Sequence, residues 1–118
     1  MKNKLSLCVI TGNAENYINR FLDHFEHLAD EIIVVRACGN KWPDGTLDIA
    51  KARGCIIDEY INFQDWPHVD DFAAARNAAL DLATGDWLMW ADTDDIITEE
   101  DCLTIRAMLP QLGDDIQG

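Results

Sequence analysis

Basic residues are scarce in this sequence. Nine lysines and arginines stand against 22 aspartates and glutamates, and the formal net charge is −13. This excess of negative charge argues against binding to nucleic acid or to an anionic membrane surface, because both are negatively charged themselves. Hydrophobic residues, by contrast, make up 48% of the chain, which excludes an intrinsically disordered segment.

Paired cysteines and long apolar runs are also absent. The four cysteines lie far apart and include no C-x-x-C pair: Cys8, Cys38, Cys55 and Cys102. We therefore expect reduced thiols in a cytoplasmic protein, with neither a disulfide framework nor a zinc site. The apolar run at residues 5–10 is too short for a signal peptide, and no stretch approaches the length of a transmembrane segment.

Short apolar runs alternate with amphipathic segments along the chain. The runs predict strands at residues 5–10, 31–35, 55–57 and 86–91. The segments predict helices at about residues 14–28, 46–53, 72–83 and 98–109, the last ended by Pro110 and Gly113. Residues 36–45 and 59–67 are expected to be loops. The length of 118 residues suggests a single domain over residues 1–118, or half of a larger one.

This alternation of strands and helices predicts an α/β fold. We expect three layers, α/β/α, around a mainly parallel sheet. The alternation alone does not fix the order of the strands, and the order considered for this sheet is 3-2-1-4. In that order the crossover direction reverses between the first and fourth strands. A crevice for a ligand should then open between residues 11–15 and residues 92–95.

An acidic motif follows the fourth predicted strand. Residues 85–95 read Gly-Asp-Trp-Leu-Met-Trp-Ala-Asp-Thr-Asp-Asp, and their apolar part predicts a strand buried on both faces. Asp92, Asp94 and Asp95 come at its carboxyl end. Crowded carboxylates repel one another, so they indicate a divalent cation, Mg²⁺ or Mn²⁺, that holds a phosphate. The alternative is a solvated acidic turn that caps the next helix.

Several motifs in order resemble the nucleotide-binding half of family 2 glycosyltransferases. They lie at residues 7–10 with Asn13 and Glu15, and at residues 30–35, 44–46, 71–80, 83–87 and 92–95. The resemblance covers about residues 5–98 and implies the GT-A fold, with its Rossmann-like nucleotide-binding half. It also implies a metal-dependent, inverting transfer of sugar from a nucleotide-sugar donor to a saccharide, lipid or protein acceptor.

The resemblance also implies a set of site residues. Asp92 and Asp94 would be the D-x-D pair that holds Mg²⁺ or Mn²⁺ against the donor diphosphate, with Asp95 in support. The cation would offset the charge that the leaving nucleoside diphosphate gains. The expected nucleotide-binding residues are Thr11, Asn13, Glu15, Arg36, Asp44, Arg76 and Asp92. An alternative for Arg76 is a salt bridge to a neighbouring aspartate, and for Glu15 a stabilising charge at the start of its helix.

Three departures from the family pattern bear on the donor rather than on the fold. Arg36 stands where the family usually has an aspartate that helps to bind the nucleobase or ribose. The loop at residues 37–43 is longer than usual and contains Trp42, which could stack on a base or pack locally. Ala14 stands where many relatives have glutamate.

The sequence stops soon after the acidic motif. Family members continue through strands that supply the acceptor site and the general base, so we expect a truncated chain, inactive alone, with the base beyond Gly118. Its fourth strand should lie at an exposed sheet edge and favour self-association. Two other hypotheses are a non-catalytic nucleotide- or metal-binding module and a haloacid dehalogenase-like phosphatase. The second arises because Asp92-x-Asp94 imitates the nucleophile motif of that class, which normally follows the first strand.

Overall fold

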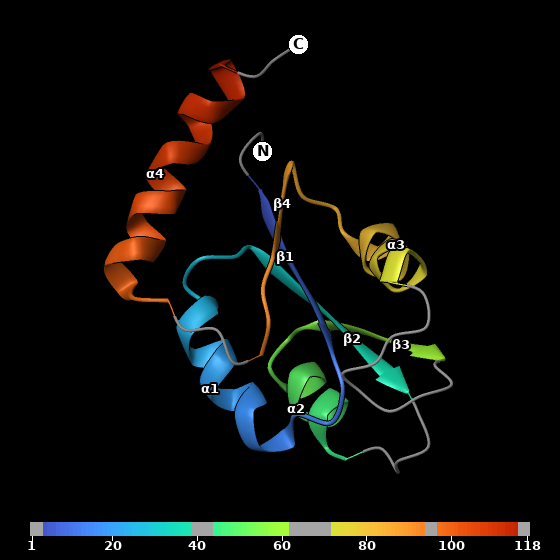
Figure 1. Cartoon of the computed structure of the whole chain (residues 1–118). Coiled ribbons are helices and arrows are strands. Elements are labelled where there is room, and N and C mark those ends of the chain that lie inside the picture. Colours follow the sequence, from blue (N-terminus) through green and yellow to red (C-terminus); the bar gives the residue numbers. More distant parts are fainter. Residues whose placement is uncertain (1–3, 39–43, 62–71, 94–96, 116–118) are drawn as a thin grey trace.

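A computed structural model describes residues 4–38, 44–61, 72–93 and 97–115. Strands and helices alternate through these residues (Figure 1). The elements are β1 (Leu5–Thr11), α1 (Glu15–Phe25), β2 (Glu31–Cys38), α2 (Thr46–Ala52), β3 (Ile56–Ile61), α3 (Phe72–Leu82), β4 (Trp87–Trp90) and α4 (Glu99–Asp115). In the described residues the strands form one parallel sheet in the order β3-β2-β1-β4, which confirms the predicted fold class.

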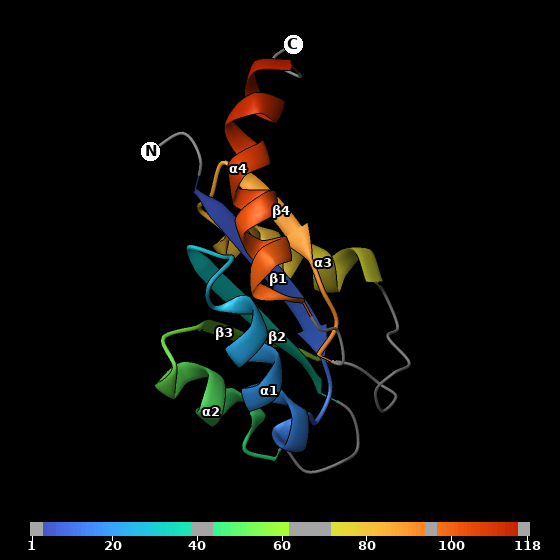
Figure 2. The same ribbon diagram turned by 90° about the vertical axis from the view of Figure 1, so that its left-hand side faces the viewer.

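The helices lie in two layers, one on each face of the sheet. Helix α3 covers one face, and α1, α2 and α4 lie on the other, which is the side that Figure 2 turns toward the viewer. Strand β1 runs between β2 and β4, and every one of its residues is buried. The sheet is therefore buried on both sides along its central strand, as expected for strands joined by helical crossovers.

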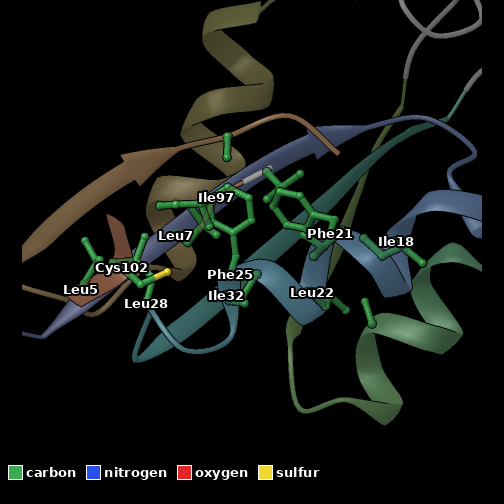
Figure 3. Packing of buried hydrophobic residues seen from close by; sticks show 14 of the residues in the cluster. Leu5, Leu7, Ile18, Phe21, Leu22, Phe25, Leu28, Ile32, Ile97 and Cys102 are labelled. Carbon is green, nitrogen blue, oxygen red and sulfur yellow. The ribbon is translucent and has the colours of Figure 1, made fainter. Parts of the chain in front are cut away.

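The larger core lies between β1 and α1. Alternate residues of β1, among them Leu5 and Leu7, point toward α1, whose Phe21 and Phe25 stack with ring centroids 4.6 Å apart (Figure 3). Cys102 brings α4 onto the same cluster. The opposite face has a smaller core of Cys8, Ile33, Val35 and Ala79.

The turn between α3 and β4 is bonded to the amino ends of β1 and β2. Glu31 accepts hydrogen bonds from the Ser6 hydroxyl at 2.5 Å, the Thr84 amide at 2.6 Å and the Thr84 hydroxyl at 2.9 Å. The Lys4 ammonium lies 3.4 Å from the same carboxylate. The motif at residues 83–87 therefore holds the sheet together at the end opposite the predicted crevice.

Four sequence predictions about element bounds or burial were wrong. Strand β2 continues to Cys38 and β3 to Ile61, because these two strands pair with each other over residues that were expected to be loops. Strand β4 is not buried on both faces: Leu88 is 49% exposed, since β4 is an edge of the described sheet. Helix α4 continues past Pro110 and Gly113 to Asp115, beyond its predicted end at about residue 109, and nothing in the described residues explains this extension.

Within the described residues no helix has both the length and the apolar character needed to cross a membrane.

Candidate functional site

The carboxyl ends of β1 and β4 bring two of the predicted segments together. The hydroxyl oxygens of Thr11, at the end of β1, and Thr93, beyond the end of β4, are 3.5 Å apart. The Ala91 amide donates a hydrogen bond to the Cys8 carbonyl at 3.2 Å, so the contact with β1 continues past Trp90. The start of the acidic motif therefore lies beside the end of β1, where the strand order predicted a crevice.

The acidic motif is only partly within the described residues. Asp92 is exposed at this edge. Asp94 and Asp95 lie outside the described ranges, as does Trp42. Over residues 4–38, 44–61, 72–93 and 97–115, no group of three or more His, Cys, Asp or Glu side chains could hold a metal ion. A metal site in the motif accordingly stays a prediction.

Arg36 is buried at the same edge of the sheet. It lies in β2 between Thr11 of β1 and Glu59 of β3 in the strand register, and only 2% of its surface is exposed. Its Nε donates to Asn13 Oδ1 at 2.8 Å, and its Nη1 lies 3.5 Å from Glu59 Oε2. The sequence prediction of a loop residue was wrong, because pairing with β3 extends β2 beyond its apolar run.

Asp44 connects the start of α2 to the start of α1. Its Oδ1 accepts hydrogen bonds from the Thr46 amide at 2.9 Å and from the Thr46 hydroxyl, while Oδ2 accepts one from the Glu15 amide at 3.0 Å. Burial raises the pKa of Asp44, but these bonds and the positive charge of Arg36 outweigh burial and lower that pKa below its usual value. Asp44 is thus held as a carboxylate.

Thr46 belongs to the same network and was missed by the sequence analysis. Its buried hydroxyl oxygen accepts a hydrogen bond from the Ala14 amide at 2.7 Å. The Glu15 side chain lies against Gly45, so closely that a Cβ at Gly45 would collide with Glu15 Oε1. The only sequence signal for these contacts is the Asp-Gly-Thr order, which also fits an ordinary turn before a helix.

Arg76 lies on the α3 side of the sheet, against β4. Its guanidinium carbon is 5.1 Å from the centroid of the Trp90 ring, within the range of a cation–π interaction. Trp90 comes two residues before Asp92, so Arg76 is near the acidic motif. In the described part of the chain the ion pairs do not include Arg76. Asp71 and Asp94 lie outside the described residues, so the alternative of a salt bridge stays untested.

Comparison with known proteins gives consistent results. The sequence model of the family described as "Glycosyl transferase family 2" matches residues 6–116. A TPR repeat-containing protein of Synechococcus elongatus is 34% identical over 108 residues, 92% of this chain and 25% of that protein. The SPbeta prophage-derived glycosyltransferase SunS of Bacillus subtilis is 29% identical over 92 residues, 78% of this chain and 20% of SunS.

Solved structures agree on the fold. The crystal structure of S. aureus TarS superposes with a TM-score of 0.69 at 25% identity, covering 92% of this chain and 20% of TarS. A structure of TarS residues 1–349 gives a TM-score of 0.66 at 27% identity, covering 92% of this chain and 32% of that one. The chain thus spans a third or less of the length of each of these proteins.

Proposed function

The chain belongs to glycosyl transferase family 2, and from this premise we propose that it is the portion, residues 1–118, that binds a nucleotide-sugar donor. One observation carries the proposal: the start of the acidic motif lies beside the end of β1, with Thr93 and Thr11 in contact. In an open parallel sheet this position, next to the strand where the order reverses, is where ligands bind.

In this proposal Asp92, Asp94 and Asp95 hold Mg²⁺ or Mn²⁺. The cation would supply positive charge next to the diphosphate, which becomes more negative as the bond to the sugar breaks. Thr11, Asn13, Glu15, Arg36, Asp44 and Arg76 surround or support the nucleotide. The contact with Trp90 supports a role for Arg76, because it holds a guanidinium near the acidic motif without an acidic partner among the described residues.

We also propose that the transfer inverts the configuration of the sugar, with a nucleophile of a saccharide, lipid or protein acceptor attacking opposite the leaving diphosphate. None of the described residues is assigned as the general base.

A location in the cytoplasm is supported by the thiols of Cys8, Cys55 and Cys102, which are free. Burial raises the pKa of Cys8 to about 11, so that thiol is protonated and unreactive at neutral pH.

Calorimetry tests the proposed site directly. Mn²⁺ is titrated in the presence of a nucleoside diphosphate into the native chain and into Asp94→Asn, Asp92→Asn and the control Asp81→Asn. Asp81 is an exposed residue of α3. We expect binding to be lost in Asp94→Asn, weakened in Asp92→Asn and unchanged in Asp81→Asn. Unchanged binding in Asp94→Asn would show that the acidic motif is a solvated turn.

Arg76 has its own test in the same assay. Arg76→Met should weaken binding of the nucleoside diphosphate because a guanidinium near the phosphates is removed, whereas Arg20→Met, an exposed site on α1, should not. Equal affinities of the two variants would mean that Arg76 only packs on Trp90.

Finally, we propose that the chain forms homo-oligomers through β4. Within the described sheet β4 pairs on one side only, with β1, and Leu88 is exposed on it. An unpaired apolar edge strand offers backbone donors and acceptors to a second copy.

A further inference from the structure

Arg36 is a charged side chain in a place that water hardly reaches. Only 2% of its surface is exposed, and a buried guanidinium is stable only if its charge and its donors are matched. Among the described residues Arg36 acts on three separate segments. It donates to Asn13 in the β1–α1 turn and lies 3.5 Å from Glu59 in β3. Its charge also lowers the pKa of Asp44, in the segment before α2. Arg36 therefore ties together parts of the chain that are not neighbours in sequence.

These contacts continue beyond Arg36. Asn13 Oδ1 accepts from Arg36 Nε at 2.8 Å and also from the Asp44 amide at 3.4 Å. Asp44 in turn accepts from the Glu15 amide, in the first turn of α1, at 3.0 Å. The position of the β1–α1 turn thus depends on a series of hydrogen bonds that begins at the guanidinium.

The positive charge of Arg36 matters as well as the shape of its guanidinium. Among the described residues, three carboxylates lie in this region: those of Glu15, Asp44 and Glu59. Arginine is a residue that only donates hydrogen bonds and stays charged. An apolar side chain of similar length would leave the Asn13 oxygen without this donor and the carboxylates without this neighbouring charge. A lysine would keep the charge but would lose the planar guanidinium, which reaches Asn13 and Glu59 at once.

We propose that Arg36 is a positioning residue for the donor site: it holds Asn13 and Asp44 in place, and through them the β1–α1 turn that would receive the nucleotide. The identity of the ligand, a nucleotide, rests on the proposed function. The contacts by which Arg36 positions the turn do not. Because only 2% of its surface is exposed, Arg36 acts through Asn13 and Asp44.

The experiment combines hydrogen exchange with nucleotide binding on the full 118-residue chain. The variants are Arg36→Met, Arg36→Lys and Asn13→Ala. The matched control is Arg106→Met, which removes a guanidinium bonded to Asp30 at 2.7 Å at the other end of the sheet. We follow the amides of Ala14 and Glu15, whose acceptors are the Thr46 hydroxyl and the Asp44 carboxylate, and we titrate UDP and GDP.

We expect protection of the two amides to fall roughly tenfold or more in Arg36→Met and Asn13→Ala, relative to amides of the central strand. Nucleotide affinity should fall by roughly 10- to 100-fold with it. Arg36→Lys should lie between the native chain and Arg36→Met, and Arg106→Met should change neither readout. If Arg36→Met does not fold, Asn13→Ala and Arg36→Lys decide the result.

Two outcomes overturn the inference. Undiminished protection of Ala14 and Glu15 in Asn13→Ala and Arg36→Lys would show that the network does not hold the turn. Lost protection with unchanged nucleotide affinity would show that the turn is not part of a nucleotide site. If the native chain binds no nucleotide, the proposed function fails, and the exchange data still decide whether Arg36 positions the turn.

Discussion

The carboxylate of Asp44 caps a helix that begins 29 residues earlier in the sequence: its Oδ2 accepts a hydrogen bond from the Glu15 amide at 3.0 Å. Helix α1 has no side-chain cap of its own, because its N-cap residue is Ala14. The other oxygen of the same carboxylate bonds to Thr46 at the start of α2. One side chain thus satisfies backbone donors at the starts of two helices and fixes the turn between β1 and α1.

Replacing Asp44 should cost more stability than replacing another acid nearby. Asp44→Asn removes the charge and turns one acceptor oxygen into a donor that faces the Glu15 or Thr46 amide. We expect a loss of about 1–3 kcal/mol in the free energy of unfolding, measured with urea. Asp48→Asn, at an exposed site on α2, is the control and should change it little. Equal effects would argue that Asp44 does not join the two helices.

Glu31 should make the protein sensitive to acid. Burial raises its pKa, but the hydrogen bonds from Ser6 and Thr84 and the charge of Lys4 outweigh burial and lower that pKa from 4.5 to about 2. The folded state therefore binds the proton more weakly than the unfolded state. The stabilisation is complete above about pH 4.5 and is lost as the pH falls toward about 2.

The measurement is the free energy of unfolding as a function of pH. Below pH 4.5 the free energy of unfolding should fall less steeply in Glu31→Gln than in the native chain. Glu100→Gln, at an exposed site on α4, should show the native decline. If the free energy of unfolding of Glu31→Gln fell with pH as steeply as that of the native chain, Glu31 would not be the source of the acid sensitivity.

Gly85 should tolerate no side chain, because of close packing rather than backbone conformation. A Cβ there would lie 2.8 Å from the Lys4 carbonyl oxygen and 2.9 Å from the Ser6 amide nitrogen, and would also collide with the Ser6 hydroxyl. Gly85→Ala should lower the melting temperature and cost about 1–3 kcal/mol. Adding Ser6→Ala should not rescue it, since the two backbone contacts remain.

Gly54 provides the comparison for Gly85. Its φ is 85°, and a Cβ would meet nothing within 4 Å. Gly54→Ala should therefore cost only the backbone strain, about 1 kcal/mol. A smaller loss for Gly85→Ala than for Gly54→Ala would be evidence against the close approach of the α3–β4 turn to β1.

Self-association should depend on the exposed edge of the described sheet. Leu88→Lys places a charge on β4, which disfavours pairing with a second copy. In sedimentation experiments the native chain should form a dimer or larger species, and Leu88→Lys should shift it toward monomer. Leu103→Lys, at an exposed apolar site on α4, is the control and should not. A native chain that stays monomeric at high concentration would refute the edge-strand proposal.

Much of the fold could be predicted from the sequence because the signals are local. Strands such as β1 and the start of β2 are continuous apolar runs, and the periodic apolar residues of α1 and the turn residues after α2 mark their helices. Alternation of the two kinds of segment is enough to imply parallel strands joined by helical crossovers. The same reasoning placed the acidic motif at the carboxyl edge beside the end of β1, and the contact of Thr93 with Thr11 confirms that placement for the start of the motif.

What the sequence alone determined is therefore the parallel sheet and, on the condition that the strand order is 3-2-1-4, the edge at which a ligand would bind. The structure has that order. Only the tertiary structure decided how the polar residues at that edge are used. Arg36 looked like a loop residue because nothing in its neighbours indicates that β3 would pair with β2 beside it, at Glu59. Asp44 and Thr46 looked like a turn because the amides that they bind, those of Glu15 and Ala14, are about 30 residues away. Burial periodicity is encoded in neighbouring residues, whereas a hydrogen-bond partner is set by which segments the fold brings together.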